Sequence, residues 1–404
     1  MKQLENIFRT LFLLVACVVF APRSHAATEA GVAYYDSVEI GLVTCTPHDE
    51  IYSLYGHAAL RLHDLHTGDD ISFNYGVFNY SQRFFVLRFV FGKTDYELGI
   101  SPFHDFCKYY ERWGSGVTEQ VLNLSSTEKR DIIKALAINY MPENRVYRYN
   151  FFYDNCATRP RDIIEQHING QIKYANHTGK APSFREMIHE HTAQHPWAAM
   201  GNDLLLGLKA DCQATLREQH FLPENLAKDF DAAQIIGGDG VSRPLVLEKR
   251  QIVPPGVQLV KKDFPLTPTA CGIILLVLSL AIALKEWKSR RTMVWWDGLL
   301  MTLTGIAGCL IVIMFFSEHP TTSTNLQVLL LNPLHLFFLP AVLRRRPTRY
   351  WKLLSILVLL FLLGGFLQDY AEGMTLLASC LLSRYVSRLV IETKRCQNNN
   401  NKKK

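Results

Sequence analysis

The segments Tyr55-Gly56-His57-Ala58-Ala59-Leu60-Arg61 and Asp154-Asn155-Cys156-Ala157-Thr158-Arg159 decide the fold of this chain. The first is typical of a strand that carries a histidine, and the second of a turn in which a cysteine precedes a helix. A histidine and a cysteine arranged in this way, about a hundred residues apart, can build a thiol nucleophile. We therefore expect a mixed α and β domain whose sheet carries His57 and whose helix begins close to Cys156.

Patterns around these two segments predict the rest of the domain. Stretches that alternate, run apolar or are rich in aromatic and β-branched residues predict strands of one sheet. These stretches are residues 38–45, 58–62, 71–80 and 146–153. Helices are predicted over 126–138 and 161–167.

The N-terminus predicts export. Residues 11–21 form an apolar run behind a basic start, and Ser24-His25-Ala26 supplies the small residues that signal peptidase requires. Residues 1–26 are therefore predicted to be a cleaved signal peptide. The alternative is a lipobox at Leu14-Val15-Ala16-Cys17, which would make the mature protein a lipoprotein beginning at Cys17.

Five apolar stretches predict membrane spans, each about long enough to cross ~30 Å of hydrocarbon. They are residues 266–284, 298–316, 326–343, 353–367 and a fifth near 374–391, which Arg384 and Arg388 interrupt. The loops between them alternate between Lys/Arg-rich and free of Lys and Arg, and the chain ends in Lys402-Lys403-Lys404. By the positive-inside rule, the basic loops and the C-terminus are cytoplasmic and everything before Leu266 is outside.

These features predict the domain organisation. The expected parts are a signal peptide at 1–26, an exported catalytic domain at 27–252, a linker at 253–265, a five-helix membrane domain at 266–391 and a cytoplasmic basic tail at 392–404. The formal net charge of +6 comes mostly from the cytoplasmic loops, so we expect no nucleic-acid partner.

The exported region carries four cysteines, Cys45, Cys107, Cys156 and Cys212. An oxidising compartment could pair some of them. A catalytic Cys156 must stay free, and the connectivity among the other three stays open, with one left over.

Cys156 is the candidate nucleophile. A cysteine attacks an acyl carbonyl as a thiolate, and a helix N-terminus and a nearby imidazole lower the thiol pKa from about 8.5 towards neutrality. Pro160 lies too deep for a helix that starts at Cys156, so the first turn is expected to be irregular or to begin nearer Thr158. The alternative is a buried structural cysteine, against which stand the polar neighbours Asp154 and Asn155.

His57 is the candidate general base, because its small neighbours leave room for a partner to approach the ring. Asn74, on the next predicted strand, is the best-placed group to orient the imidazole, with Asp70 and Asn79 as alternatives. A histidine of the core is the competing interpretation of His57.

Three further patterns have ordinary explanations. His189, His191 and His195 resemble metal ligands, but this spacing on a polar helix is typical of a solvated face, and we predict no metal. The aromatic run at 84–91 could line an acyl-chain tunnel or contact the bilayer, although burial in the core is its ordinary explanation. Ser317-Glu318-His319 resembles a hydrolase site without a thiol, and is predicted to be a polar surface facing the exported domain.

Six segments together resemble the Lnb-type bacterial lipoprotein N-acyltransferases. The resemblance covers nearly the whole chain, and the combination is specific although each segment alone is weak. The segments are Tyr55 to Arg61, Phe73-Asn74-Tyr75-Gly76-Val77-Phe78, Pro142-Glu143-Asn144-Arg145-Val146-Tyr147-Arg148-Tyr149, Asp154 to Arg159, His319-Pro320-Thr321 and Asn332-Pro333-Leu334.

The order histidine, polar residue, cysteine is also similar to the circularly permuted papain-like folds, which are related to NlpC/P60 and lecithin:retinol acyltransferase proteins. The resemblance implies that Cys156 is the nucleophile and His57 the base. The resemblance supports Asn74 as the third catalytic residue less strongly, because the residue type at this position varies among the permuted papain-like folds. The predicted supporting or substrate-binding residues are Tyr55, Asn155, Arg159 and Asp162, and Arg83 is a further candidate for lipid phosphate.

The reaction that the resemblance implies joins two lipidic substrates. Cys156 would take an acyl chain from a phospholipid as a thioester and pass it to the α-amino group of the diacylglyceryl cysteine of an apolipoprotein. The implied location is the bacterial inner membrane, with the catalytic domain in the periplasm. No cofactor is expected, and the oligomeric state stays open.

Two other functions remain at this point. A membrane-anchored cysteine amidase or peptidase would act on cell-wall peptides, although a soluble wall peptide needs no access to the bilayer. A non-catalytic envelope binding or assembly protein would use His57 and Cys156 structurally, and predicts that Cys156→Ser leaves function intact.

Overall fold

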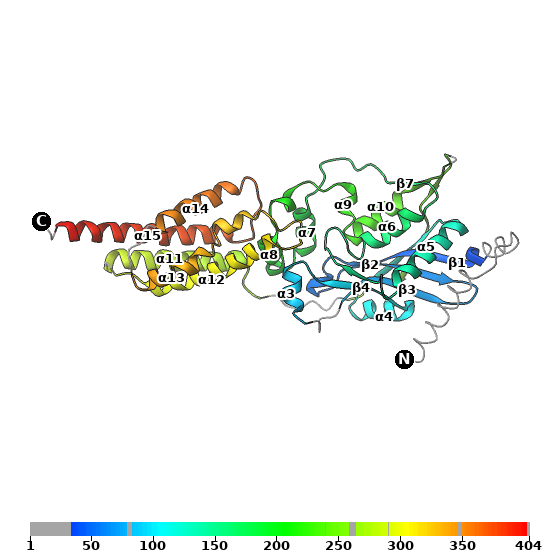
Figure 1. Cartoon of the computed structure of the whole chain (residues 1–404), viewed down its shortest axis with the longest axis horizontal. Helices are drawn as coiled ribbons and strands as arrows, with labels where there is room; N and C mark the ends of the chain where they lie inside the picture. The colour runs from blue at the N-terminus through cyan, green and yellow to red at the C-terminus, as the bar shows by residue number, and fades with distance from the viewer. Residues whose placement is uncertain are drawn as a thin grey trace. The chain divides into compact units, whose positions relative to one another are not determined.

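The computed structural model describes residues 34–78, 83–238, 240–257, 264–289, 291–345 and 350–401. They form two compact units (Figure 1). The sheet-rich unit contains the described residues of 34–85, 93–180 and 215–257, and the helical unit those of 86–92, 181–214 and 264–401. The predicted signal peptide with Cys17, the alternative site residue Asn79 and Lys402 to Lys404 lie outside the described residues.

The sheet-rich unit is organised around a seven-stranded sheet whose neighbouring strands are all antiparallel, in the order β10-β5-β1-β2-β3-β4-β6. The strands are β1 Val38–Cys45, β2 His57–Asp64, β3 Asp70–Val77, β4 Asp95–Pro102, β5 Val117–Leu122, β6 Val146–Arg148 and β10 Val246–Val253. The predicted strands at 38–45 and 58–62 are confirmed as β1 and β2.

Two predicted strands are shorter than expected. The one predicted at 71–80 ends at Val77, and the one predicted at 146–153 ends at Arg148. The second stops early because Asn150 turns the chain. Its side-chain oxygen accepts from the backbone N–H groups of Phe152 and Tyr153, and its backbone oxygen accepts from Asp154. This turn brings Cys156 to the sheet.

Helices cover both faces of the main sheet (Figure 1). One face packs against α5 Ser126–Tyr140, α6 Thr158–His167 and α10 Pro223–Ala232, and the other packs against α4 Phe103–Arg112. The predicted helix at 126–138 is confirmed as α5, and Ser125 caps it together with Glu128. The smaller elements are η1 Tyr35–Ser37, η2 Ile51–Ser53, α9 Leu216–Gln219 and a three-stranded sheet of β7 Gln171–Lys173, β8 Gln234–Ile236 and β9 Ser242–Pro244.

Because side chains alternate along a strand, β2 divides its residues between the two cores. Ala58 and Leu60 pack in the core under α5, α6 and α10, whereas Ala59 packs in the core under α4. His57 therefore points to the α4 side, where its ring lies 6.1 Å from that of Tyr110 and 6.4 Å from that of Phe106.

The helical unit contains the apolar helices. Its elements are α7 Phe184–Thr192, α8 Pro196–Leu205, η3 Leu208–Asp211, α11 Pro268–Ser289, α12 Val294–Phe315, η4 Leu326–Leu329, α13 Leu334–Leu343, α14 Tyr350–Gly364 and α15 Met374–Asn401. Helix α3, Phe85–Val90, begins at the last residue of one segment of the sheet-rich unit and continues into the helical unit. The helical unit thus takes in 86–92 and 181–214, which lie within the range predicted for the exported domain.

Four helical segments of the described residues are long and apolar enough to cross a membrane. They are Pro268–Ser289, Val294–Phe315, Leu326–Leu343 and Met374–Thr393. The remaining predicted span, 353–367, corresponds to α14, which has 15 residues. A helix of that length rises only about 22 Å, so the expectation of five full-length spans is met for four.

The two arginines that interrupt the last span are buried by ion pairs. Arg384 binds Asp297 at 2.8 Å and Glu286 at 2.9 Å, and Arg388 also binds Asp297. All four side chains are at most 4% exposed. Because the charges balance within α11, α12 and α15, the apolar character of this bundle is preserved.

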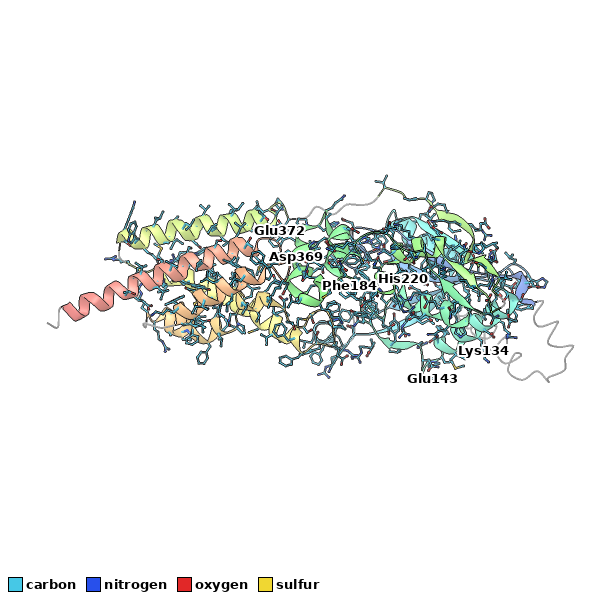
Figure 2. All side chains as sticks on the ribbon, turned by 90° about the horizontal axis from the view of Figure 1, so that it is seen from above. Lys134, Glu143, Phe184, His220, Asp369 and Glu372 are labelled. Atoms are coloured by element: carbon cyan, nitrogen blue, oxygen red, sulfur yellow. The ribbon has the colours of Figure 1, made fainter. Side chains whose placement is uncertain are left out.

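Short polar contacts join the helices at the opposite end of the bundle. Asp369 and Glu372 lie in the loop between α14 and α15 (Figure 2). Glu372 accepts a hydrogen bond from the backbone N–H of Thr269 at 3.1 Å, and Gln368 donates to the backbone oxygen of Leu206 at 3.1 Å. The loop therefore fastens segment 181–214 to the apolar helices.

Candidate active site

A tight turn delivers His57 to the start of β2. Gly56 has a φ of +72°, and a Cβ at this position would lie 2.8 Å from the backbone oxygen of Cys45. Both features require glycine. Since Cys45 pairs with His57 across β1 and β2, the turn holds the histidine at one end of the sheet.

The turn that carries Cys156 is held by Asn155 and Thr158. The Asn155 side-chain oxygen accepts from the backbone N–H groups of Ala157 and Thr158, each at 2.9 Å. In return, the hydroxyl of Thr158 accepts from the backbone N–H of Asn155 at 2.8 Å. These reciprocal bonds close the turn that leads into the helix, so Cys156 lies in a rigid, preorganised turn.

Asn155 also ties this turn to the rest of the unit. Its side-chain amide donates to the backbone oxygens of Phe151 and Phe221, each at 2.8 Å, and the residue is 2% exposed. Helix α6 begins at Thr158, so Pro160 falls in its first turn, where a backbone N–H would have no partner within the helix. The expectation that the helix begins nearer Thr158 is confirmed.

Cys156 and His57 form a hydrogen-bonded pair. Burial opposes ionisation of the thiol. The charge and hydrogen bond of His57, together with the N–H groups of Ala58 and Cys156, outweigh burial and lower the pKa of Cys156 below its usual value. Burial also lowers the pKa of His57, but the Cys156 thiolate and Asn74 raise it overall. Each group therefore stabilises the ionised form of the other, the thiolate of Cys156 and the imidazolium of His57.

Asn74 completes the arrangement. Its Oδ1 lies 2.7 Å from Nε2 of His57. Because an amide oxygen only accepts, Nε2 must carry the hydrogen, which leaves Nδ1 for the sulfur. The alternative third residue Asp70 instead binds Arg61 at 2.7 Å. Among the described residues, Asn74 is thus the candidate that contacts the histidine.

Gly76 shapes the space beside the pair, and sequence reasoning did not single it out. A Cβ on this residue would lie 3.7 Å from the Cβ of Cys156 and 3.8 Å from Cε1 of His57. Its φ is +102°. The residue therefore keeps the backbone of β3 close to the reactive groups without filling the volume next to them. The sequence could have pointed to Gly76 through its position two residues after Asn74 on the same predicted strand.

The predicted supporting residues have different surroundings. Tyr55 packs its ring 4.9 Å from that of Phe151. Arg159 binds Asp154 through two bonds of 2.6 and 2.8 Å, and its guanidinium lies 3.6 Å above the ring of Tyr147. Both residues thus brace the segment that carries Cys156.

Asp162, one turn further along α6, is directed elsewhere. It accepts from Arg161 at 2.9 Å and from Arg217 at 2.5 Å. These bonds tie α6 to α9, and they place Asp162 in a surface ion network and not with the cysteine and histidine.

The histidine-rich segment belongs to the helical unit. His189 on α7 bonds both oxygens of Asp203, at 2.9 and 2.8 Å, and Asp203 also binds Arg185 at 2.7 Å. Among the described residues, no group of three or more His, Cys, Asp or Glu side chains could hold a metal ion. The same residues contain no disulfide, and Cys45 and Cys107 are free and buried.

Comparison with known families finds a match for residues of both units. The Lnb N-terminal periplasmic domain matches residues 30–190, and the Lnb transmembrane domain matches residues 260–396. The chain belongs to the Lnb family. The Lnb periplasmic match contains His57, Asn74 and Cys156, so the whole candidate site lies within the family's own domain. No curated protein and no solved structure matches the chain.

Proposed function

We propose that this Lnb protein is a thiol-dependent lipoprotein N-acyltransferase. The observation that carries the proposal is the half-buried Cys156–His57–Asn74 arrangement, in which the histidine lowers the pKa of the thiol and the asparagine orients the histidine. The chain is a membrane-associated envelope protein of the Lnb type. A thiol nucleophile in such a protein is suited to acyl donors and acceptors that reside in the bilayer.

In the first half-reaction, the Cys156 thiolate attacks an ester carbonyl carbon of a phospholipid. A C–S bond forms, and the carbonyl electrons move to the oxygen. When the intermediate collapses, the ester C–O bond breaks, and the His57 imidazolium gives its proton to the departing glycerol oxygen. The products are a thioester on Cys156 and a lysophospholipid.

In the second half-reaction, the α-amino group of a diacylglyceryl cysteine attacks the thioester carbonyl. Neutral His57 takes a proton from this nitrogen as the C–N bond forms. The C–S bond then breaks, which leaves an amide on the lipoprotein and restores the thiolate of Cys156. Asn74 keeps the imidazole in the same orientation through both transfers.

The negative oxygen of each intermediate needs preorganised donors. The backbone N–H of Cys156 helps to lower the pKa of its own thiol, and it comes from a turn held by Asn155. It is therefore our candidate for one oxyanion donor, because it costs no reorganisation during the reaction.

We further propose that α14 completes a fifth crossing, with the C-terminus cytoplasmic and the site periplasmic. Helix α14 begins beside α15, where Trp351 donates to Glu392 at 3.1 Å. It ends next to η4, where a Cβ on Gly364 would lie 3.0 Å from Leu326. Its two ends thus reach both ends of the bundle, which favours a short span in a locally thinned bilayer.

The test is mass spectrometry of the N-terminal peptide of a lipoprotein from cells that lack their own N-acyltransferase. The cells are complemented with the unmutated gene, with Cys156→Ala or with His57→Ala. We expect an N-linked acyl chain with the unmutated gene alone, while all three proteins insert equally. An N-linked chain with Cys156→Ala would refute the mechanism. Absence of the chain with every gene would favour an amidase or a binding protein.

A further inference from the structure

The aromatic segment 84–91 lies on the surface of the molecule. The sequence pattern has burial in the core as its ordinary explanation, but Phe84 is 60% exposed, Leu87 55% and Phe89 46%. Phe91 is also exposed. Large apolar side chains that stay exposed together mark a surface for a partner or a membrane.

The second half of this segment is attached to the loop that follows α12, within the helical unit. The backbone N–H of Glu318 donates to the oxygen of Phe91 at 3.0 Å, and Nε2 of His319 donates to the oxygen of Phe89 at 3.0 Å. Gly92 permits this approach, because a Cβ there would lie 3.1 Å from the backbone nitrogen of Glu318. Since α12 ends at Phe315, the segment is attached just beyond the end of an apolar helix that is long enough to span a membrane.

The residue that follows α12 extends the exposed apolar residues of that helix. Phe316, the residue after α12, is 78% exposed, and the loop from Ser317 to Asn325 carries no lysine or arginine. Arg83 is exposed and its guanidinium lies 4.8 Å above the ring of Phe84. Aromatic rings beside a cation are typical of the level of lipid headgroups.

Within the sheet-rich unit, a row of rings leads from the candidate site to the start of α3. Consecutive centroids lie 5.2 to 6.4 Å apart, except for one pair of tyrosines whose hydroxyls lie 3.4 Å apart. Tyr52 and Tyr109 in this row are exposed. In order, the rings belong to His57, Tyr110, Tyr109, Tyr52, Phe78 and Phe85.

We propose that segment 84–91 is a membrane-interface element that holds phospholipid for the site. Phe84, Leu87 and Phe89 insert among the acyl chains of the periplasmic leaflet, and Arg83 stays at the level of the phosphates. The row of rings from Phe85 to His57, of which Tyr52 and Tyr109 are exposed, gives one acyl chain an apolar route towards Cys156. The insertion of segment 84–91 into the leaflet is argued only from the exposure of its side chains and its attachment to the loop after α12. The acyl-chain route to Cys156 also rests on the proposed function.

Photo-cross-linking tests the insertion directly. Benzoylphenylalanine is placed at Leu87 in the full chain, reconstituted in vesicles of phosphatidylethanolamine and phosphatidylglycerol. The matched control carries the same group at Leu65, which is 57% exposed in the turn between β2 and β3. We expect phospholipid adducts on the peptide containing residue 87 and none on that containing residue 65. Equal yields at both positions, or no adduct at residue 87, would overturn the insertion.

A pair of substitutions tests the route. Leu87→Asp is expected to lower acyl transfer from vesicle phospholipid by about tenfold or more, because a carboxylate resists entry into the leaflet. Leu65→Asp should leave transfer unchanged. Acylation of Cys156 by a water-soluble p-nitrophenyl butyrate should be equal in all three proteins. The route would be rejected if Leu87→Asp lost the reaction with the soluble ester. It would also be rejected if Leu87→Asp transferred acyl chains from vesicle phospholipid as fast as the unmutated protein.

The two proposals fail in distinguishable ways. If the unmutated protein shows no Cys156 acylation with either donor, the proposed function fails and the route fails with it. The cross-linking result still decides the insertion in that case, because it needs no catalysis.

Discussion

Asn74 accepts a hydrogen bond from Nε2 of His57 at 2.7 Å, so the imidazole presents its other nitrogen to Cys156. Asn74→Ala should therefore lower the rate of Cys156 acylation by about tenfold, because the ring loses its orientation while the thiol and base remain. The rate is measured with a soluble ester, so that lipid delivery does not enter. An unchanged rate would remove Asn74 from the site.

Asn74→Asp separates orientation from charge. The carboxylate still accepts from Nε2, so most activity should remain, and its negative charge should raise the pKa of His57 further. The pH at which the rate declines on the alkaline side should then move upward. A decline at the same pH as in the unmutated protein would mean that residue 74 does not face the ring.

Thiol reactivity should depend on pH with a definite sign. The pKa of Cys156 is lowered and that of His57 is raised. The thiolate should thus persist below the usual thiol range near 8.5, and be lost only as pH falls through the lowered value. His57→Ala removes the favourable charge and leaves burial, so the pKa of Cys156 should rise above that range. Iodoacetamide labelling at pH 7 should fall by about tenfold or more.

The labelling has an internal control in the same protein. Cys212 is exposed and far from this pair in the chain, so its labelling rate should be equal in the His57→Ala and unmutated proteins. The rates are read by mass spectrometry of the two peptides. Equal loss at both cysteines would indicate a general change in the labelling reaction and not loss of activation, whereas unfolding would expose the buried Cys45 and Cys107 and label them.

The cap around Cys156 should be sensitive to one hydroxyl. Thr158→Val keeps the shape of the side chain but leaves the buried N–H of Asn155 without its acceptor. The expected cost is about 1–3 kcal/mol of unfolding free energy, together with slower Cys156 labelling. Thr158→Ser keeps the oxygen and should cost less than about 1 kcal/mol. Equal thermal midpoints for the two variants would contradict the role of this bond.

The buried charges of the helical unit should be strongly coupled. Asp297→Asn leaves Arg388 and Arg384 without their shared carboxylate, which should destabilise the unit by about 3–5 kcal/mol. Replacing all four charged residues by apolar ones of similar size should cost less. Thermal denaturation in detergent measures both. If Asp297→Asn is as stable as the unmutated protein, the ion pairs of Asp297 with Arg384 and Arg388 contribute nothing to stability.

The sequence predicts the candidate site because its signals are local. His57, Asn74 and Cys156 lie in short segments with recognisable neighbours, and Pro160 already indicates where α6 begins. Antiparallel pairing then brings these segments together. Apolar stretches predict the spans equally well, because hydropathy is a property of consecutive residues.

Features that depend on residues far apart in the sequence cannot be predicted from local patterns. Arg384 and Arg388 interrupt a span until the structure places Asp297 and Glu286 against them. Similarly, β10 joins the main sheet through β5, more than a hundred residues earlier in the chain. Leu87 is exposed on a segment that is attached to the loop after α12, more than two hundred residues later in the chain, and no local pattern contains this attachment.

We expect the acyl carbonyl to lie next to β3, in the space beside Gly76, and substitutions of this residue test that placement. Gly76→Ala places a methyl group 3.7 Å from the Cβ of Cys156 and 3.8 Å from Cε1 of His57. It also strains a residue with a φ of +102°. Gly68→Ala is the matched control, because Gly68 has a φ of +78° but no atom within 4 Å of an added Cβ.

Both variants should lose about 1–2 kcal/mol of stability from the left-handed backbone. Only Gly76→Ala should slow acylation of Cys156, and Gly76→Val should abolish it, since the larger side chain fills the volume beside the sulfur. Acylation by a soluble ester and thermal unfolding are measured on all three proteins. If Gly76→Val acylates as fast as Gly68→Ala, the substrate approaches Cys156 from another side, and the proposed placement of the carbonyl next to β3 is wrong.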